Sequence, residues 1–179
     1  MDKKEIRAMI REARAAFPDG VRDSEAVWKK VESLEEFKHA GTVLIYWSLP
    51  GEVITESFIE KWHGRKRIIL PLVEGDDLRL KEYCPGKLKE GFRGIMEPSA
   101  DAPEVSTEEI DFAIIPGVAF DSHCERLGRG RGFYDRLLPA IECPVAGVGY
   151  DFQIVEEVPI NERDQHLSMV VTPTYLFIR

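Results

Sequence analysis

A glycine-rich stretch between residues 126 and 136 carries four arginines in an otherwise acidic chain. Glycine lets backbone N–H groups approach an anion without interference from a Cβ atom, and guanidinium groups donate charge-assisted hydrogen bonds to phosphate oxygens. The helix expected directly after the stretch adds a partial positive charge at its N-terminus. This alternation predicts a phosphate-binding loop. Its glycines are Gly128, Gly130 and Gly132, and its arginines are Arg126, Arg129, Arg131 and Arg136.

The glycine spacing differs from that of the two common nucleotide-binding turns. The stretch lacks the Gly-Lys-Ser/Thr of a Walker A loop and the Gly-x-Gly-x-x-Gly of a dinucleotide-binding turn. A flexible, solvated loop would have the same composition. Aromatic residues flank the stretch, with Phe120 before it and Phe133 and Tyr134 at its end, and they favour an ordered loop.

The N-terminal segment predicts an amphipathic helix with one cationic side. Cations recur every three or four residues, so their side chains share one side of the helix. This side is either solvated or able to bind an anion. The apolar side is formed by Ile6, Met9, Ile10 and Ala13, and the cationic side by Lys3, Arg7, Arg11 and Arg14.

Other polar residues leave a structural and a chemical interpretation open. Asp135 and Asp164 are either magnesium ligands or residues that stabilise a helix start and a turn. Trp47, on a predicted strand, belongs either to the core or to the wall of a ring-binding site. His123 and Cys124 are adjacent, and neighbours in sequence rarely face each other as a nucleophile and its base.

Composition excludes several classes of protein. The 179 residues include 24 Lys and Arg against 32 Asp and Glu, a net charge of −8, which argues against a general nucleic-acid binder but allows a local basic pocket. The apolar runs are far shorter than the ~20 residues of a membrane span, and the charged N-terminus has no apolar signal core behind it. Three cysteines without a Cys-x-x-Cys pair predict a reduced, cytoplasmic protein.

Apolar strands alternate with helical segments along the whole chain, which predicts one α/β domain over residues 1–179. We expect a three-layer, Rossmann-like arrangement: a mostly parallel sheet with helices on both faces. Besides the N-terminal helix, the predicted helices begin near Ser24, after Thr55, and at 134–138, with a short turn or helix at 154–157. The predicted strands are 42–47, 67–73, 78–83, 110–115, 144–150 and 168–178, and 98–107 is a surface loop.

Such sheets bind ligands beyond the carboxyl ends of their strands. The Gly/Arg stretch follows the strand predicted at 110–115, so we expect it at that edge.

The run from Ile115 to Asp121, followed by Arg126-Leu-Gly-Arg-Gly-Arg-Gly-Phe-Tyr-Asp-Arg, resembles the signature of the 5-formyltetrahydrofolate cyclo-ligase family. Three further segments agree in order and spacing, so the resemblance covers nearly the whole chain. They are Lys3–Arg7, Leu49–Thr55, and Val158–Asp164 followed by Val170–Thr172. The resemblance implies ATP- and Mg²⁺-dependent closure of 5-formyltetrahydrofolate to 5,10-methenyltetrahydrofolate, with release of ADP and phosphate.

The resemblance also implies roles for individual residues. The folate contacts would be Trp47 and Glu52, and the magnesium ligands Asp135 and Asp164. The ATP contacts would be Lys3, Lys4 and Arg7 near the N-terminus, and Arg126, Leu127, Gly128, Arg129, Gly130, Arg131, Gly132, Phe133 and Tyr134 in the loop.

The implied chemistry transfers the γ-phosphoryl group of ATP to the formyl oxygen, after which N10 attacks the carbon and phosphate leaves. This mainly requires positioning and stabilisation of charge, for which Arg129 and Arg131 are the expected catalytic cations. No nucleophilic side chain is needed. The expected partner is a small-molecule folate rather than nucleic acid or membrane, and the expected state is a monomer. The alternatives are another ATP-dependent ligase or kinase on this scaffold, or a nucleotide- or folate-binding protein without activity.

Overall fold

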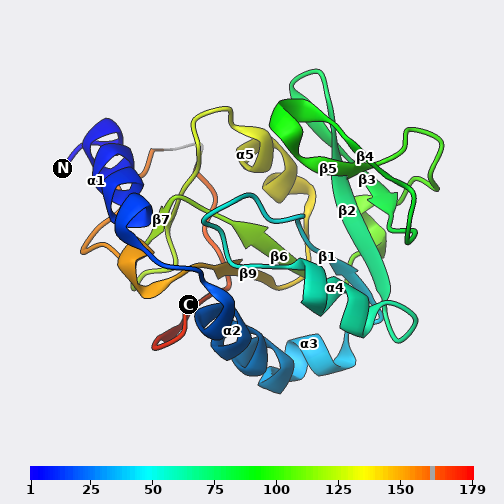
Figure 1. Cartoon of the computed structure of the whole chain (residues 1–179), viewed down its shortest axis with the longest axis horizontal. Coiled ribbons are helices and arrows are strands. Elements are labelled where there is room, and N and C mark those ends of the chain that lie inside the picture. Colours follow the sequence, from blue (N-terminus) through cyan, green and yellow to red (C-terminus); the bar gives the residue numbers. More distant parts are fainter. Residues whose placement is uncertain (162–163) are drawn as a thin grey trace.

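A seven-stranded sheet forms the centre of the computed structural model, which describes residues 1–161 and 164–179 (Figure 1). Its five inner strands pair in parallel, and the strand at each edge is antiparallel to its neighbour, which confirms the predicted mostly parallel sheet. In spatial order the strands are β11 (Leu176–Ile178), β10 (Met169–Val171), β9 (Val145–Val148), β6 (Phe112–Pro116), β1 (Thr42–Leu44), β2 (Arg67–Glu74) and β3 (Asp77–Glu82).

Helices cover both faces of the sheet, as predicted. In Figure 1, α2 (Val21–Ser33) and α3 (Glu35–His39) lie below the strands, and α5 (Phe133–Leu137) lies above them. The helix α4 (Glu56–Trp62) joins β1 to β2, and α1 (Lys3–Ala16) lies at the side near the N-terminus. Asp2 caps α1, because its carboxylate accepts hydrogen bonds from the N–H groups of Lys4 and Glu5.

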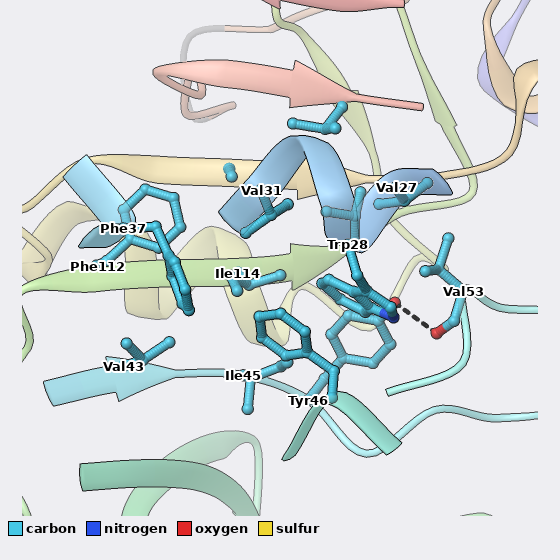
Figure 2. Close-up of a cluster of buried hydrophobic side chains, with 14 of the residues drawn as sticks. Val27, Trp28, Val31, Phe37, Val43, Ile45, Tyr46, Val53, Phe112 and Ile114 are labelled. Carbon is cyan, nitrogen blue, oxygen red and sulfur yellow. Dashed lines mark hydrogen bonds between the residues drawn. The ribbon is translucent and has the colours of Figure 1, made fainter. Parts of the chain in front are cut away.

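The larger buried cluster lies between the sheet and the helices α2, α3 and α4, and Figure 2 shows its centre. Val43 and Ile114 are apolar on a strand face that is covered by helices, as expected for parallel strands. Two buried aromatic residues also fix the chain that follows β1. Tyr46 Oη donates to Val53 O at 3.0 Å (Figure 2), and Trp28 Nε1 donates to Ile54 O at 2.6 Å. The turn at residues 49–52 is thereby held against the core.

The opposite face of the sheet packs on a second cluster, to which α5 and the 3₁₀ turn η3 (Leu138–Ala140) contribute Leu137 and Leu138. A third, smaller cluster joins α1 to a short ribbon of β7 (Ala119–Phe120) and β8 (Arg126–Leu127). Ile6 and Ile10 of α1 are its fully buried members from the N-terminal segment. This cluster fixes α1 beside the Gly/Arg stretch that follows β8.

Several expected boundaries were wrong. The helix expected from Ser24 begins at Val21, and Ser24 lies buried inside it, where its hydroxyl and that of Tyr150 lie 2.9 Å apart. Met9 was expected in the core but is 41% exposed. The strand expected to reach Trp47 ends at Leu44, because the chain leaves the sheet there.

Other differences concern the connections. The strand expected at 168–178 is two antiparallel strands, β10 and β11. The hairpin of β4 (Leu88–Glu90) and β5 (Met96–Pro98), with the turn η1 (Phe92–Gly94) between them, was not predicted. No helix forms at 154–157, where a short turn or helix was expected: the 3₁₀ turn η4 (Asp151–Gln153) ends just before this segment, and η2 (Thr107–Glu109) precedes β6. Glu162 and Arg163, part of the C-terminal motif, lie outside the described residues.

None of the helices in residues 1–161 and 164–179 combines the length and apolar character needed to cross a bilayer.

Candidate active site

The sheet has a topological switch point between β1 and β6. From β1 the chain passes through α4 to β2 on one side, whereas β6 leads to β9 on the other side. Ligands of open α/β sheets bind beyond the carboxyl ends of the strands at such a point. A pocket opens there: Tyr46 and Trp47 line it after β1, and Pro116 and Gly117 line it at the end of β6.

The Gly/Arg loop (residues 128–132) forms another wall of this pocket. It begins where the β7–β8 ribbon ends, and the N–H of Val118 donates to Leu127 O across that ribbon at 2.7 Å. Gly130 and Gly132 have φ values of +99° and +70°, a region in which a side chain would be strained. Arg7 of α1 fixes the start of the loop, because its Nε donates to Gly128 O at 2.9 Å. The loop is therefore held by specific contacts at several points.

Arg126 is an internal cation of the pocket. Its side chain is 4% exposed, and Nη2 donates to Asp135 Oδ1 at 2.7 Å. The guanidinium carbon lies 5.5 Å from the centre of the Tyr134 ring. Burial raises the pKa of the Tyr134 hydroxyl above its ordinary value, so this group is a neutral hydrogen-bonding group beside Arg126. Arg126 and Tyr134 thus form a packed support behind the loop.

Arg129 and Glu52 form an ion pair inside the pocket. Arg129 Nη2 donates to Glu52 Oε1 at 2.6 Å, and the N–H of Leu49 donates to Glu52 Oε2 at 2.9 Å. The side chain of Glu52 is 6% exposed, whereas that of Arg129 is 45% exposed. The resemblance implied an ATP contact for Arg129 and a folate contact for Glu52. Their pairing, across 77 positions of sequence, was not predicted.

Arg131 lies beside two aromatic rings. Its guanidinium carbon is 5.1 Å from the centre of the Phe92 ring and 5.8 Å from that of Phe133. The two rings meet edge to face at 5.7 Å. Phe92 belongs to the turn η1, so the β4–β5 hairpin covers the end of the Gly/Arg loop. This hairpin was not predicted from the sequence, and Phe92 was therefore not among the predicted site residues.

The cationic side of α1 is directed partly toward the loop. Lys3 Nζ pairs with Asp164 Oδ2 at 2.5 Å, and Arg7 reaches Gly128 as described above. Lys4 and Arg11 are exposed, and Arg14 is half-buried. The interpretation of this side as wholly solvated was wrong for Lys3, Arg7 and Arg14.

Trp47 occupies both of its expected environments. It is half-buried, packs against the larger core cluster and lies 6.3 Å from the ring of Tyr83. It also lines the pocket, on the same segment as Glu52. Trp47 thus combines a contact with the core and a position at the wall of the pocket.

The two candidate magnesium ligands each have a cationic partner. Asp135 lines the pocket and pairs with Arg126; Asp164 pairs with Lys3 and also accepts from the N–H of Asn161 at 2.7 Å. Within the described residues, no three His, Cys, Asp or Glu side chains converge as a complete metal site. Magnesium commonly uses one or two carboxylates together with phosphate oxygens and water. The carboxylate of Asp135, beside the Gly/Arg loop, has the donor chemistry for that kind of binding, whereas Asp164 is not among the residues that line the pocket.

Cys124 and His123 do not form a catalytic pair. Cys124 is fully buried, and burial raises the pKa of its thiol, whereas His123 is exposed. A protonated, inaccessible thiol is a poor nucleophile. The structure therefore agrees with the expectation that these neighbouring residues do not act as a nucleophile and its base.

Glu97 is a second buried carboxylate at the pocket and was not singled out by its sequence. It is 6% exposed, and the N–H of Val73 donates to Oε1 at 3.2 Å. Burial raises the pKa of Glu97, although hydrogen bonds from the N–H groups of Val73 and Phe92 act in the opposite direction. An isolated glutamate before a proline gives no local sign of such burial.

Comparisons with known proteins converge on one family. The profile of the 5-formyltetrahydrofolate cyclo-ligase family matches residues 1–173. The 5-formyltetrahydrofolate cyclo-ligase of Escherichia coli K12 is 37% identical over 144 residues, which cover 75% of this chain and 79% of that protein. The enzyme of that name from Mycolicibacterium smegmatis is 31% identical over 189 residues, which cover 96% of this chain and 93% of the relative.

Solved structures agree with these sequence matches. The NMR structure of Aquifex aeolicus 5,10-methenyltetrahydrofolate synthetase superimposes with a TM-score of 0.89 at 36% identity and covers 99% of this chain and 93% of that chain. A 5,10-methenyltetrahydrofolate synthetase from Mycoplasma pneumoniae has the same fold, with a TM-score of 0.79 at 23% identity, and the match covers 97% of this chain and 99% of that chain.

Proposed function

The chain belongs to the 5-formyltetrahydrofolate cyclo-ligase family, whose activity is the ATP-dependent closure of 5-formyltetrahydrofolate to 5,10-methenyltetrahydrofolate, and we propose that the pocket between β1 and β6 performs this reaction. The ion pair between Arg129 and Glu52 carries the assignment to this pocket. It joins the loop suited to phosphate to the turn suited to folate. Both substrates must meet in one place for a phosphoryl transfer between them.

The nucleotide phosphates would lie on the Gly/Arg loop. The glycines leave the backbone N–H groups accessible to phosphate oxygens, and Arg129 and Arg131 keep exposed guanidinium groups at the pocket. Arg126 and Tyr134 would act from behind by holding the loop. The other ATP contacts would be Lys3, Lys4, Arg7, Leu127 and Phe133, of which Lys3 and Arg7 already contact the neighbouring segments.

The folate would occupy the more apolar part of the pocket. Trp47, Leu49 and Phe92 provide surfaces for the flat pterin ring, and Glu52 provides a carboxylate that accepts hydrogen bonds from ring N–H groups. The Tyr46 and Trp28 hydrogen bonds described above hold the turn before α4. Glu52 is therefore placed by a rigid segment, which is what orientation of a substrate requires.

The reaction proceeds in two steps. In the first, the formyl oxygen attacks the γ-phosphorus of ATP, ADP leaves, and the nitrogen lone pair of N5 completes an iminium phosphate. In the second, N10 attacks the activated carbon and loses its proton, and inorganic phosphate leaves as the five-membered ring closes. Arg129 and Arg131 would stabilise the charge on the transferring phosphoryl group.

Magnesium would be held by Asp135 and Asp164 together with phosphate oxygens and water, and when bound it would neutralise phosphate charge. The Arg126 and Lys3 partners of these carboxylates keep the side chains in place before nucleotide binds. We further propose a monomer, since all these groups belong to one chain, and a reducing compartment such as the cytoplasm, since all three thiols are free.

The test is a spectrophotometric assay of the conjugated methenyl product with the purified protein, ATP, Mg²⁺ and 5-formyltetrahydrofolate. We expect product in proportion to ADP released, and no product without ATP. ADP release that folate does not stimulate would indicate a kinase or ligase for another substrate. Binding of both ligands without product would indicate a protein without catalytic activity.

A further inference from the structure

Arg14, in the last turn of α1, has buried hydrogen-bond donors that no acceptor uses. Its Nε and Nη2 are inaccessible to solvent and have no hydrogen-bond partner among residues 1–161 and 164–179. A guanidinium group carries five N–H donors and stays charged, so unused buried donors are costly. Such an arrangement is expected where another state of the protein supplies the missing acceptor.

The turn that carries Glu52 lies directly against Arg14. Gly51 has a φ of +80°, and a Cβ atom at this position would lie 2.5 Å from Cδ and 3.2 Å from Nε of Arg14. Burial, followed by the charge of Arg129, lowers the pKa of the Arg14 guanidinium, while the charge of Glu52 raises it. Arg14 therefore lies within electrostatic reach of both members of the ion pair. Arg14 and Glu52 also line a second, more open hollow together.

Two guanidinium groups thus lie near one buried carboxylate, and among the described residues the guanidinium that bonds it directly is that of Arg129. Arg129 is the more exposed partner, whereas Arg14 is half-buried and packs against Gly51. The proposed function requires Arg129 to turn toward phosphate oxygens when the nucleotide binds. Glu52 would then lose its charged partner while remaining almost fully buried, a condition that strongly disfavours the charged form.

We propose that Arg14 takes over Glu52 when Arg129 moves to the nucleotide, and that this exchange couples nucleotide binding to folate binding. The inference rests on the proposed function of the pocket. Arg14 is a positioning residue in this scheme: its spare donors bind Glu52, and Glu52 keeps the orientation and charge with which it contacts the folate. Coupling of this kind is reciprocal, so bound folate also favours nucleotide binding.

The experiment measures the Kd of 5-formyltetrahydrofolate by calorimetry, with and without a saturating non-hydrolysable ATP analogue. Arg14→Met keeps the alkyl contact with Gly51 and removes the charge and the donors. Without the analogue, Arg129 still holds Glu52, so the Kd should stay within about twofold of that of the unmodified protein. With the analogue, the Kd of the Arg14→Met variant should be about tenfold higher than that of the unmodified protein. Arg14→Lys should recover most of this loss, and Arg11→Met, at an exposed position one turn earlier, should change neither value.

The nucleotide dependence distinguishes the proposal from a purely structural role. An equal loss of folate affinity with and without the analogue would overturn it, as would an unchanged Kd in Arg14→Met with the analogue, or a Lys variant as defective as the Met variant. If Arg14→Met does not fold, Arg14→Gln provides the same comparison with smaller donors. Turnover of the unmodified protein in the methenyl assay tests the proposed function separately.

Discussion

Arg126 Nη2 lies 2.7 Å from Asp135 Oδ1. A buried guanidinium group is thereby bonded to Asp135, which of the two candidate magnesium ligands is the one that lines the pocket. The two residues are nine positions apart, one at the end of β8 and the other in the first turn of α5. The pair therefore closes the Gly/Arg loop at its base. A carboxylate in this position has a structural function and a proposed metal-binding function that mutation can separate.

Replacement of Asp135 by Asn should affect both functions. In the variant, Arg126 stays buried but loses its carboxylate partner. The free energy of unfolding, measured in urea, should therefore fall by about 1–3 kcal/mol. It also removes one hard oxygen ligand, so the Mg²⁺ concentration for half-maximal activity should rise about tenfold. Asp77→Asn, whose exposed side chain pairs with Arg136 at 3.3 Å, is the matched control and should change neither quantity. An identical Mg²⁺ titration in Asp135→Asn would remove Asp135 from the metal site.

Arg131→Ala should weaken use of ATP far more than it weakens folding. The side chain is exposed, and within residues 1–161 and 164–179 its guanidinium group lies over the rings of Phe92 and Phe133, so stability should fall by less than about 1 kcal/mol. Loss of a phosphate contact should raise the KM for ATP, or lower kcat, about tenfold or more. Arg22→Ala, at an exposed position of α2, provides the control. Unchanged KM and kcat would show that Arg131 does not contact the phosphates.

Trp47→Leu tests the folate wall of the pocket. Leucine keeps an apolar contact with the core but lacks a flat ring, so the KM for 5-formyltetrahydrofolate should rise about tenfold while the KM for ATP changes little. Trp62→Leu is the matched control, since Trp62 packs on Phe37 at 5.0 Å and does not line the pocket. That variant should lose stability without a change in either KM. Normal folate affinity in a folded Trp47→Leu would assign Trp47 to the core alone.

The strands buried on both faces could be predicted from the sequence, because helices on both sides require continuous apolar runs. The run 110–115 and the observed β6 differ by two residues at the start and one at the end. The β4–β5 hairpin could not be predicted in this way. Its first strand, Leu88–Glu90, is mostly charged and solvated, and no alternation of apolar residues marks it.

The site was predictable in its residue types but not in its pairings. Glycines and arginines in alternation carry a local chemical signal, whereas the bond between Arg129 and Glu52 depends on how the fold places the segment after β8 against the segment after β1. Ser24 illustrates the same limit within the core. A serine near the start of a helical pattern predicts an N-cap. Ser24 instead lies within the helix, where its hydroxyl accepts a hydrogen bond from the N–H of Ile54 and bonds to the hydroxyl of Tyr150.

Glu97→Gln should stabilise the protein at neutral pH. Burial raises the pKa of Glu97, so between its unfolded and folded pKa values the folded state binds more protons than the unfolded state. Stability due to this group is thus fully present below the unfolded pKa and is lost as the pH rises through the folded pKa. Glutamine can still accept the N–H of Val73 without a buried charge. We expect the free energy of unfolding of Glu97→Gln to exceed that of the unmodified protein by roughly 1 kcal/mol or less at pH 7. Near pH 4 this difference should disappear.

Urea unfolding at several pH values measures this difference. Glu90→Gln, at an exposed position of the same hairpin, should show no comparable dependence on pH. A loss of stability in Glu97→Gln at pH 7 would mean that the ionised carboxylate is the better acceptor for these backbone groups.

Phe92→Ala tests whether the β4–β5 hairpin serves the site. The ring of Phe92 contacts Phe133 at the start of α5 and the guanidinium group of Arg131. Without it, Arg131 loses a surface that orients it, and the pocket loses part of an apolar wall. Both KM values should rise about three- to tenfold, and Phe92→Leu should give an intermediate result because it restores apolar area without the ring. Phe177→Ala, at the opposite edge of the sheet, removes a half-buried ring that stacks on Tyr175 at 5.4 Å and should leave both KM values unchanged. If Phe92→Ala lost stability to the same extent and kept normal KM values, the hairpin would be a structural cover of the sheet edge with no part in binding either substrate.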